Sequence, residues 1–245
     1  MIRIENLHKR FGDVRAVDGV SFSAADGQVT GLLGPNGAGK TTTLRMLYTL
    51  MLPDEGEILV DGINAVADPQ GARFALGVLP DQSGLYPRLT AREHIEYFGE
   101  LQGVTGADLR SRTDHLLKML DMHAIADRRV AGFSHGERTK TALARAIVHN
   151  PKNVLLDEPT NGLDVMSTRA MRKLIRELRD QGKCVLFSSH VMQEVSALCD
   201  VIVIVAGGRV VARGTPDQLR QLSGHDDLED VFVNLTGLDS VEARA

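Results

Sequence analysis

Tryptophan is absent from the sequence, cysteine occurs only twice, and there is no long hydrophobic run. Neither Cys184 nor Cys199 belongs to a C-x-x-C pattern, so neither a zinc site nor a disulfide framework is expected. Both are predicted to be reduced core thiols of a cytosolic protein. The best apolar run, Val201–Ala206, has six residues, whereas a helix that spans a bilayer needs about 18 or more. The N-terminal residues alternate between apolar and polar, which is typical of neither a signal peptide nor a transit peptide.

An excess of one charge is lacking as well. The formal net charge of −4 over 245 residues excludes a protein that coats nucleic acid with its whole surface. Hydrophobic residues make up 43% and charged residues 24% of the chain, which excludes wholesale disorder. A chain of this length forms one large domain or two small ones, and it can bury a sizeable core without disulfides or a structural metal.

Short apolar runs alternate with longer segments of helical periodicity, which predicts a mixed α/β fold. Several of these runs are apolar throughout, as strands buried on both faces of a parallel sheet are, whereas the early ones alternate as in a half-exposed antiparallel sheet. The predicted strands are Ile2–Leu7, Val17–Ser23, Gln28–Leu33, Gly56–Val60, Leu76–Leu79, Asn153–Asp157, Lys183–Ser188, Val201–Val205 and Arg209–Ala212.

Residues 90–150 show almost no strand signal and predict three helices inserted into the α/β framework. Thr90 and Glu93 form a T-x-x-E capping box that opens the first helix. The second helix is expected from about Ala107 to Met122, and the third begins at Ser134.

One loop matches the pattern G-x-x-x-x-G-K-[ST], with an apolar strand before it and a helical pattern after it. Glycines let the backbone turn its N–H groups toward a di- or triphosphate, and the following helix adds its N-terminal dipole. Lys40 then supplies a charge to the β- and γ-phosphates, and the Thr41 hydroxyl can bind magnesium. The alternative, an ordinary glycine-rich turn between strand and helix, does not account for the complete pattern. The residues expected at the nucleotide are Gly34, Pro35, Asn36, Gly37, Ala38, Gly39, Lys40, Thr41 and Thr42.

The apolar strand Asn153–Asp157 ends in two carboxylates, Asp157 and Glu158. Ligands bind at the C-terminal ends of parallel strands, so Asp157 is placed to hold magnesium and Glu158 to orient and polarise the attacking water. Taken alone, the pair is equally well explained as a strand followed by an acidic helix cap. The phosphate-binding loop elsewhere in the chain favours the catalytic interpretation.

Two further segments have functional and structural interpretations. His190 follows the strand ending at Ser188, so it is either a surface loop residue or within reach of the γ-phosphate. Ser134 and Glu137 form an S-x-x-E capping box, which by itself favours a plain helix cap. A helix N-terminus opened by serine and glycine is nevertheless also a binding site for anions.

The order and spacing of these motifs resemble an ABC-type ATPase, the nucleotide-binding subunit of an ABC transporter, up to about Arg220. The resemblance rests on the phosphate loop at Gly34, FSHGE, LLDEP, NGLD and SSH. It implies a P-loop NTPase fold with a RecA-like core, an N-terminal antiparallel β subdomain and a helical insert. The domain expected is 1–222, with a helical subdomain at about 86–150 and a C-terminal appendage at 223–245.

The resemblance also assigns roles to individual residues. Ser134 and Gly136 match the signature segment, which caps the ATP held by a partner subunit, and Glu137 of the same segment is also expected at the nucleotide. Glu158 matches the catalytic glutamate, and Phe11 matches the aromatic residue that stacks on adenine. The remaining matches are Asp164 to the D-loop aspartate and His190 to the switch histidine.

The chain departs from the family pattern in two places. His135 and Glu137 replace the first glycine and the glutamine of the signature. After Pro80, Asp81 stands where the family has glutamine, and Gln82 follows one place later, so either of the two is a candidate ligand for the metal.

The resemblance implies an ATP- and Mg²⁺-dependent subunit at the cytoplasmic face of the cell membrane, which forms a homodimer, drives a separate permease and binds no nucleic acid. The tail Leu228–Phe232 and the stretch TNGLDVMSTRAMR resemble export-type ATPases of the sodium-exporting NatA family, with drug-resistance exporters as close competitors. A soluble ABC ATPase acting on the ribosome or DNA is the alternative, although the chain lacks a second cassette and sustained heptads. A P-loop GTPase would need an N-K-x-D motif, which is absent, and a kinase would not need Ser134–Glu137 or His190.

Overall fold

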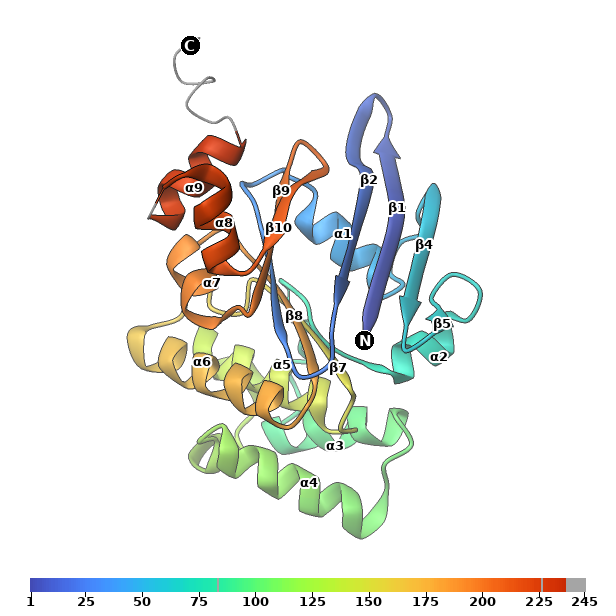
Figure 1. Cartoon of the computed structure of the whole chain (residues 1–245). Helices are drawn as coiled ribbons and strands as arrows, with labels where there is room; N and C mark the ends of the chain where they lie inside the picture. The colour runs from blue at the N-terminus through green and yellow to red at the C-terminus, as the bar shows by residue number, and fades with distance from the viewer. Residues whose placement is uncertain (83, 226, 237–245) are drawn as a thin grey trace.

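The computed structural model describes residues 1–82, 84–225 and 227–236. Figure 1 shows two β-sheets side by side, with most helices gathered around the second sheet. The ten strands of the described residues are β1 (Ile2–Phe11), β2 (Val14–Ala24), β3 (Val29–Leu33), β4 (Glu55–Val60), β5 (Ile63–Asn64), β6 (Leu76–Leu79), β7 (Asn153–Asp157), β8 (Cys184–Ser189), β9 (Val201–Ala206) and β10 (Arg209–Gly214).

From β3 onward, helices are interspersed among the strands, and three α-helices follow one another between β6 and β7. Two short 3₁₀ helices, His123–Ile125 and Val130–Gly132, join the second and third helices of the insert. The α-helices of the described residues are α1 (Lys40–Leu47), α2 (Pro69–Phe74), α3 (Ala91–Leu101), α4 (Gly106–Met119), α5 (His135–Ile147), α6 (Val165–Asp180), α7 (Met192–Leu198), α8 (Pro216–Ser223) and α9 (Leu228–Thr236).

The first sheet is antiparallel, with the strand order β2-β1-β4-β5. Buried and exposed residues alternate at the start of β1, where Ile2 and Ile4 are buried and Arg3 is exposed. This is the half-exposed sheet that the alternating sequence predicts. Its last strand, β5, has only two residues, too few for a period of two to be read in the sequence.

The second sheet has the strand order β10-β9-β3-β8-β7-β6. The strands from β9 to β6 are parallel, and β10 runs antiparallel at one edge. Every residue of β3, β7 and β8 is buried, as the continuous apolar runs predict. The C-terminal ends of β3 and β7 lie on either side of the end of β8, so the segments that follow these strands lie close together.

Two hydrophobic cores hold these layers together. One lies between the two sheets and contains Leu44 and Leu47 of α1. The other lies between the second sheet and the helices α3 to α7. Helix α1 therefore lies between the two sheets (Figure 1). Because the helix is fixed there, the loop that joins β3 to α1 is fixed as well.

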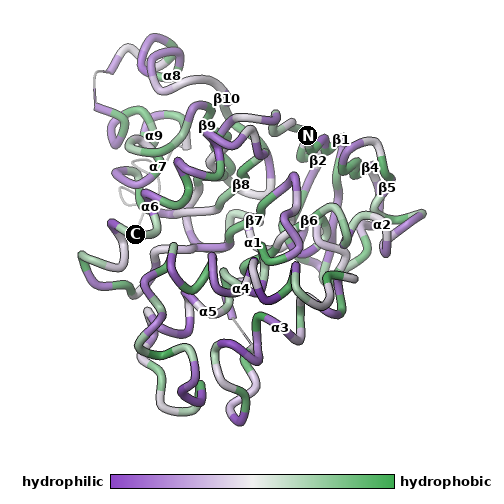
Figure 2. Tube along the Cα trace, turned by 90° about the horizontal axis from the view of Figure 1, so that it is seen from below, coloured by the Kyte–Doolittle hydropathy of each residue, from purple (hydrophilic) through white to green (hydrophobic). Residues whose placement is uncertain are grey.

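The helical insert agrees with the sequence prediction. In α3 the Thr90 side chain accepts a hydrogen bond from Glu93 N–H and the Glu93 carboxylate accepts one from Thr90 N–H, so the predicted capping box is present. The second helix ends at Met119, three residues before the expected Met122. Figure 2 shows α3, α4 and α5 grouped on one side, with hydrophobic and hydrophilic segments alternating along them, as expected for helices that bury one face.

The C-terminal appendage predicted at 223–245 falls partly outside the described residues, which end at Thr236 and omit position 226. Within them, α9 packs against α7, β9 and β10. Both cysteines are buried and form no disulfide, and burial raises the pKa of Cys184 to about 12. No described helix combines the length and the apolar character needed to cross a membrane.

Candidate active site

The loop between β3 and α1 requires glycine at two positions because neighbouring backbone lies against it. A side chain at Gly34 would bring a Cβ atom to 2.3 Å from the carbonyl oxygen of Val205. At Gly39 it would lie 2.3 Å from the carbonyl oxygen of Ala16, and the φ of 99° is in the left-handed region. Gly39 is the N-cap of α1 and has no side chain to occupy the first backbone N–H groups. These groups therefore stay available for an anion.

Lys40 is buried and points back over this loop. Its Nζ donates to the carbonyl oxygens of Gly34 at 2.7 Å and Pro35 at 3.1 Å. It also lies 3.8 Å from Glu158 Oε1. Burial lowers the pKa of Lys40, while the nearby charges of Glu158 and Asp157 oppose that shift. The ammonium group is thus held at the mouth of the loop by neutral oxygens and one carboxylate.

Asp157 ends β7 beside the start of α1. Its Oδ1 accepts hydrogen bonds from Ser188 Oγ at 2.6 Å and from Thr41 Oγ1 at 3.4 Å. Its Oδ2 is buried and has no hydrogen-bond partner. Burial raises the pKa of Asp157, the charges of Asp81 and Glu158 add to the rise, and the Ser188 bond opposes it. A buried carboxylate oxygen without a partner, next to a threonine hydroxyl, fits a hard cation such as Mg²⁺.

Glu158 follows directly and has a backbone φ of 50°, which is uncommon for a residue with a side chain. Its backbone N–H donates to Ser188 Oγ at 3.0 Å, and its Oε2 lies 2.9 Å from His190 Nδ1. Ser188 therefore contacts both acidic residues and links the ends of β7 and β8. Its hydroxyl bonds could not be predicted from the sequence, although its place at a strand end was visible.

The structure separates the two candidate metal ligands that follow Pro80. Asp81 lines a small cavity of about 50 Å³ together with Asp157 and Glu158. Gln82 instead lines a different groove, together with Phe98 and His149. Asp81 therefore faces the acidic pair, and Gln82 faces the helical insert.

The signature segment opens α5 as a capping box. Ser134 Oγ accepts from Glu137 N–H at 3.2 Å, and Glu137 accepts from Ser134 N–H at 2.7 Å. The hydrogen bond from the Ser134 backbone N–H is the main cause that lowers the pKa of Glu137. The bond that involves the Ser134 side chain adds to this fall, and burial opposes it. Both interpretations of the sequence thus remain compatible, because the cap leaves the helix N-terminus at the surface.

His135 and Gly136 connect this segment to the loop after β7. His135 Nε2 lies 2.9 Å from the carbonyl oxygen of Asn161. A Cβ atom at Gly136 would lie 3.1 Å from Ser167 Oγ, and Asp164 caps α6 by accepting from Ser167 N–H at 2.8 Å. In one subunit, the signature segment therefore packs against the segment that carries Asp164.

Phe11 lies at the end of β1, in the hairpin next to the phosphate-binding loop. The ring is 47% exposed, and Lys9 Nζ lies 5.9 Å from its centre. The same hairpin continues to Ala16, whose carbonyl oxygen lies against Gly39. An exposed aromatic ring is thus available at the edge of the loop.

A buried carboxylate that the sequence reasoning missed connects the turns after β7 and β8. Glu194 Oε2 accepts hydrogen bonds from Thr160 Oγ1 and, at 3.2 Å, from Ser189 Oγ. Thr160 lies two residues after Glu158, and Ser189 directly precedes His190. The sequence did contain one indication that Glu194 is buried. It stands four residues before the apolar Leu198 and so shares the buried face of this helix.

These groups form one site at the C-terminal edge of the second sheet. The loop can hold phosphate groups, Lys40 can neutralise their charge, and Thr41 with Asp157 can hold Mg²⁺. Glu158 is held in hydrogen-bonding contact with His190 and close to Lys40, in a position to act on a water molecule. The arrangement fits hydrolysis of a nucleoside triphosphate.

Comparison with known proteins agrees with this chemistry. The family described as ABC transporter matches residues 17–161. The ABC transporter ATP-binding protein NatA of Bacillus subtilis is 42% identical over 239 residues, which are 96% of this chain and 97% of that protein. The daunorubicin resistance ATP-binding protein DrrA3 of Streptomyces coeruleorubidus is 37% identical over 231 residues, which are 94% of this chain and 73% of that protein.

Solved structures show the same fold. An ATP-binding subunit of an ABC transporter has a TM-score of 0.90 at 29% identity and covers 96% of this chain and 99% of its own. A dimeric ATP-binding cassette in a post-hydrolysis state, bound to ADP and inorganic phosphate, has a TM-score of 0.80 at 27% identity, covering 88% of this chain and 98% of its own. The predicted fold class is confirmed. The chain belongs to the ABC transporter family and is an ATP-binding subunit that hydrolyses ATP.

Proposed function

We propose that this chain is the motor of an exporter and that ATP hydrolysis at its site drives a sodium ion or a drug-like solute through a separate membrane permease. The observation that carries the energy-supplying half of the proposal, ATP hydrolysis, is the joint placement of Lys40, Asp157, Glu158 and His190 at one edge of the sheet. The name of the daunorubicin resistance relative supports a drug-like solute. The resemblance of the tail to the NatA family supports sodium.

In the proposed mechanism, residues 34–42 hold the phosphates of ATP through backbone N–H groups, and Lys40 leaves the carbonyl oxygens of Gly34 and Pro35 to contact the γ-phosphate. Glu158 orients and polarises the attacking water, and His190 fixes the Glu158 carboxylate through its bond to Oε2. The left-handed backbone at Glu158 and the Ser188 bond to its N–H direct the carboxylate toward the loop.

Thr41 and Asp157 are the proposed ligands of Mg²⁺. The unpartnered Asp157 Oδ2 and the Thr41 hydroxyl are hard oxygen donors, as this ion prefers. When bound, Mg²⁺ neutralises charge that develops on the β- and γ-phosphate oxygens. Asp81 is the better candidate for a further contact at the metal, because it shares a cavity with Asp157 whereas Gln82 does not line it.

Phe11 is proposed to stack on the base of the nucleotide. Its exposed ring lies in the hairpin that contacts Gly39, and a stacked ring reads no base edge. ATP and GTP are therefore both expected to bind, with at most a modest preference.

A homodimer with two composite sites is proposed, in which Ser134 and Gly136 of one subunit face the nucleotide of the other. The support is that the exposed Ser134 caps the N-terminus of α5, with Gly136 in its first turn, and that the family's signature lies there. Glu137 holds the Ser134 backbone N–H, so its proposed part is to fix this helix end. The ATPase domain is proposed to extend over 1–222, with the helical subdomain at about 86–150.

The permease is proposed to dock on a groove between the helical insert and the sheet. This groove has a volume of about 380 Å³ and is lined by Gln82, Phe98 and Arg145 among others. Exposed apolar side chains lie around it, including Tyr86 and Tyr97, which pack edge to face with ring centres 6.3 Å apart. Because Asp81 at the acidic pair and Gln82 in the groove are adjacent, a change at the nucleotide is transmitted to the docking surface.

The deciding experiment is purification of the chain with its membrane partner, followed by reconstitution in liposomes. We expect ATPase activity to rise with sodium or with daunorubicin, and cysteines introduced at Tyr86 and Tyr97 to crosslink to the permease. A cysteine introduced at exposed Val14, in the first sheet, serves as the control and should not crosslink. Crosslinks confined to the first sheet would contradict the docking surface, and purification with ribosomes or DNA instead of a membrane protein would favour the soluble alternative.

A further inference from the structure

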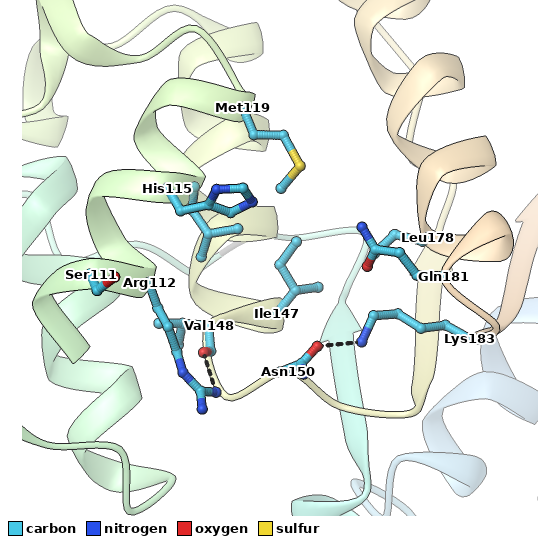
Figure 3. A pocket seen from close by; sticks show the side chains of 11 residues that line it. Ser111, Arg112, His115, Met119, Ile147, Val148, Asn150, Leu178, Gln181 and Lys183 are labelled. Atoms are coloured by element: carbon cyan, nitrogen blue, oxygen red, sulfur yellow. Dashed lines mark hydrogen bonds between the residues drawn. The ribbon is translucent and has the colours of Figure 1, made fainter. Parts of the chain in front are cut away.

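A second cavity lies at the opposite edge of the second sheet from the candidate active site. It has a volume of about 370 Å³ and lies between α4 of the helical insert and the segments that lead into β7 and β8. Asn150 and Lys183 precede these strands, whereas Asp157 and His190 follow them. Figure 3 shows α4 on one side of the cavity and Lys183 on the other.

The lining combines an apolar floor with a polar rim. Ile147 and Val148 lie at its base, at the end of α5, and Met119 reaches over it from α4 (Figure 3). The volume falls within the range of about 300–1,000 Å³ that small-molecule sites occupy. A pocket of this kind suits a ligand with a short apolar body and a polar head.

The charged groups of the lining are all basic. Arg112 and Lys183 line it, His115 stands beside them, and no carboxylate is among the lining residues. Lys183 is 9% exposed, and its Nζ donates to Asn150 Oδ1 at 2.6 Å and to the Pro151 carbonyl oxygen at 2.7 Å. Both acceptors are neutral, and an ammonium group has a third donor. This buried cation therefore lacks a carboxylate partner within the described part of the chain.

The opposite wall adds a second cation. Arg112 pairs with Asp108 at 2.9 Å, on the turn before it, while its Nη1 donates to the Val148 carbonyl oxygen at 3.3 Å. Burial is the main cause that lowers the pKa of the neighbouring His149, and the positive charges of Lys183 and Arg112 lower it further. Asp108, which does not line the cavity, pairs with Arg112 alone among the residues that the structure describes, so the charge of Lys183 is not neutralised by a carboxylate there.

We propose that this cavity binds a small organic anion. Its head group takes the free donor of Lys183 and the Nη1 side of Arg112, and its short apolar body lies against Ile147, Leu178 and Met119. Such a ligand contacts α4 and the start of β8 together, so it joins the helical insert to the sheet at a distance from the nucleotide. A carboxylate and a phosphate monoester share this chemistry, and the experiment separates them.

The test uses the Met119 methyl group as a reporter. The protein is labelled with ¹³C-methyl methionine, the Met119 signal is assigned with Met119→Leu, and hexanoate, hexyl phosphate and 1-hexanol are titrated separately. We expect a saturable shift of the Met119 signal with one or both anions and about tenfold weaker binding of 1-hexanol, because its hydroxyl makes no charge-assisted bond. Met46, in the other core, should not shift.

Two variants make the result specific. Lys183→Met and Arg112→Gln should each weaken anion binding by about tenfold, whereas Lys173→Met, which removes an exposed cation of α6, should leave it unchanged. If Lys183→Met does not fold, the anion affinity of Arg112→Gln tests the proposal alone. An unshifted Met119 signal at saturating probe, equal binding of 1-hexanol, or wild-type affinity in the folded variants would overturn the proposal.

Discussion

At the scale of single residues, the site depends on charges that are buried before any nucleotide arrives. Lys40 and Asp157 are both buried, and their pKa values move in opposite directions, downward for the amine and upward for the acid, chiefly because of burial. Each pKa shift means that the charged form of the side chain is less favourable in the nucleotide-free protein than in water. A bound triphosphate with its cation supplies the opposite charges and relieves both costs.

Replacing Lys40 with alanine should abolish hydrolysis and weaken ATP binding. The loss of its ammonium leaves charge on the γ-phosphate unneutralised, and a comparable cation, the arginine finger of other phosphoryl-transfer sites, contributes a factor of about 10³–10⁵ in rate. Phosphate release at saturating Mg-ATP measures the effect, with Lys173→Ala on exposed α6 as the control. Turnover above a tenth of the wild-type rate would show that Lys40 has a different role.

Replacing Phe11 with alanine should weaken nucleotide binding by about 1–3 kcal/mol, the usual contribution of one stacked aromatic ring. Because stacking is insensitive to base identity, the affinities for ATP and GTP should fall by similar factors. Phe74→Ala, which removes a ring of similar exposure from α2, is the matched control. Unchanged affinity in Phe11→Ala, measured by calorimetry, would remove this ring from the site.

Glu194 is predicted to position the residues around it rather than to contact ATP. Its replacement by alanine leaves the hydroxyls of Thr160 and Ser189 buried without their acceptor, which should lower the free energy of unfolding by about 1–3 kcal/mol. Because these hydroxyls belong to the turns that carry Glu158 and His190, kcat should fall by about 10- to 100-fold with little change in KM.

Glu194→Gln retains one acceptor oxygen and should recover part of both losses. Steady-state kinetics and urea unfolding distinguish the cases. A loss of stability in Glu194→Ala without any change in kcat would assign this carboxylate to the core alone.

At the scale of secondary-structure elements, a contact between the segment that follows α5 and the start of β6 introduces a pH dependence. His149 Nε2 lies 3.1 Å from the Leu76 carbonyl oxygen. Burial lowers the pKa of His149, the charges of Lys183 and Arg112 lower it further, and the Leu76 bond opposes the shift. Below the unfolded pKa of about 6.5, the unfolded chain gains a proton that the folded chain excludes, so stability falls with falling pH until the folded pKa is passed.

His149→Gln should therefore reduce the loss of stability between pH 7 and pH 5. The glutamine amide can still donate to the Leu76 carbonyl oxygen, and one proton contributes at most about 1.4 kcal/mol per pH unit. His94 is also buried with a lowered pKa, so the slope should become smaller without vanishing. Urea unfolding at both pH values gives the slope, with exposed His123→Gln as the control. An unchanged slope in His149→Gln would contradict the argument.

Elements with continuous patterns could be predicted from the sequence. The apolar runs of β3, β7 and β8 and the capping boxes at Thr90 and Ser134 appear where they were expected. Helix α2 was missed because its six residues contain a glycine and only one that is buried, although Asp68 caps it through Gly71 N–H. Strand β5 and helix α9 were missed for similar reasons, since short elements show no clear period.

Within the site, the motifs predicted the residue types and their order but not their contacts. The sequence placed Asp81 and Gln82 as equal candidates, and only the direction of the chain after β6 separates them. Glu194 looked like one more acidic residue of a helix, because its partners Thr160 and Ser189 are 34 and 5 positions away. Long-range pairings of this kind are set by sheet topology rather than by local pattern.

At the scale of the whole molecule, the proposed homodimer gives each subunit two half-sites. In this proposal the phosphate-binding loop, Asp157 and Glu158 form one half, and the N-terminus of α5 at Ser134 forms the other. In the single chain, the signature segment packs against Asn161 and Ser167, so it is held at the surface by the segment that follows the catalytic strand. A second copy of the chain related by two-fold symmetry would complete both sites at once.

ATP should favour the closed dimer by its greater affinity for that state, and ADP should not, because it lacks the γ-phosphate that the helix N-terminus at Ser134 would bind. Glu158→Gln retains size and hydrogen bonding but loses the carboxylate that polarises water. It should therefore bind Mg-ATP normally and hydrolyse it very slowly. Adding Ser134→Arg should dissociate the dimer, because a bulky side chain would occupy the γ-phosphate position.

The most direct test is the mass of Glu158→Gln by light scattering at saturating Mg-ATP and, separately, at saturating Mg-ADP. The account predicts a dimer with ATP, a monomer with ADP, and a monomer with either nucleotide once Ser134→Arg is added. ATP-binding subunits can dimerise weakly without their membrane partner, so the measurement is repeated with the membrane subunit present. A Glu158→Gln protein whose two copies do not close on Mg-ATP in either setting would contradict the composite site.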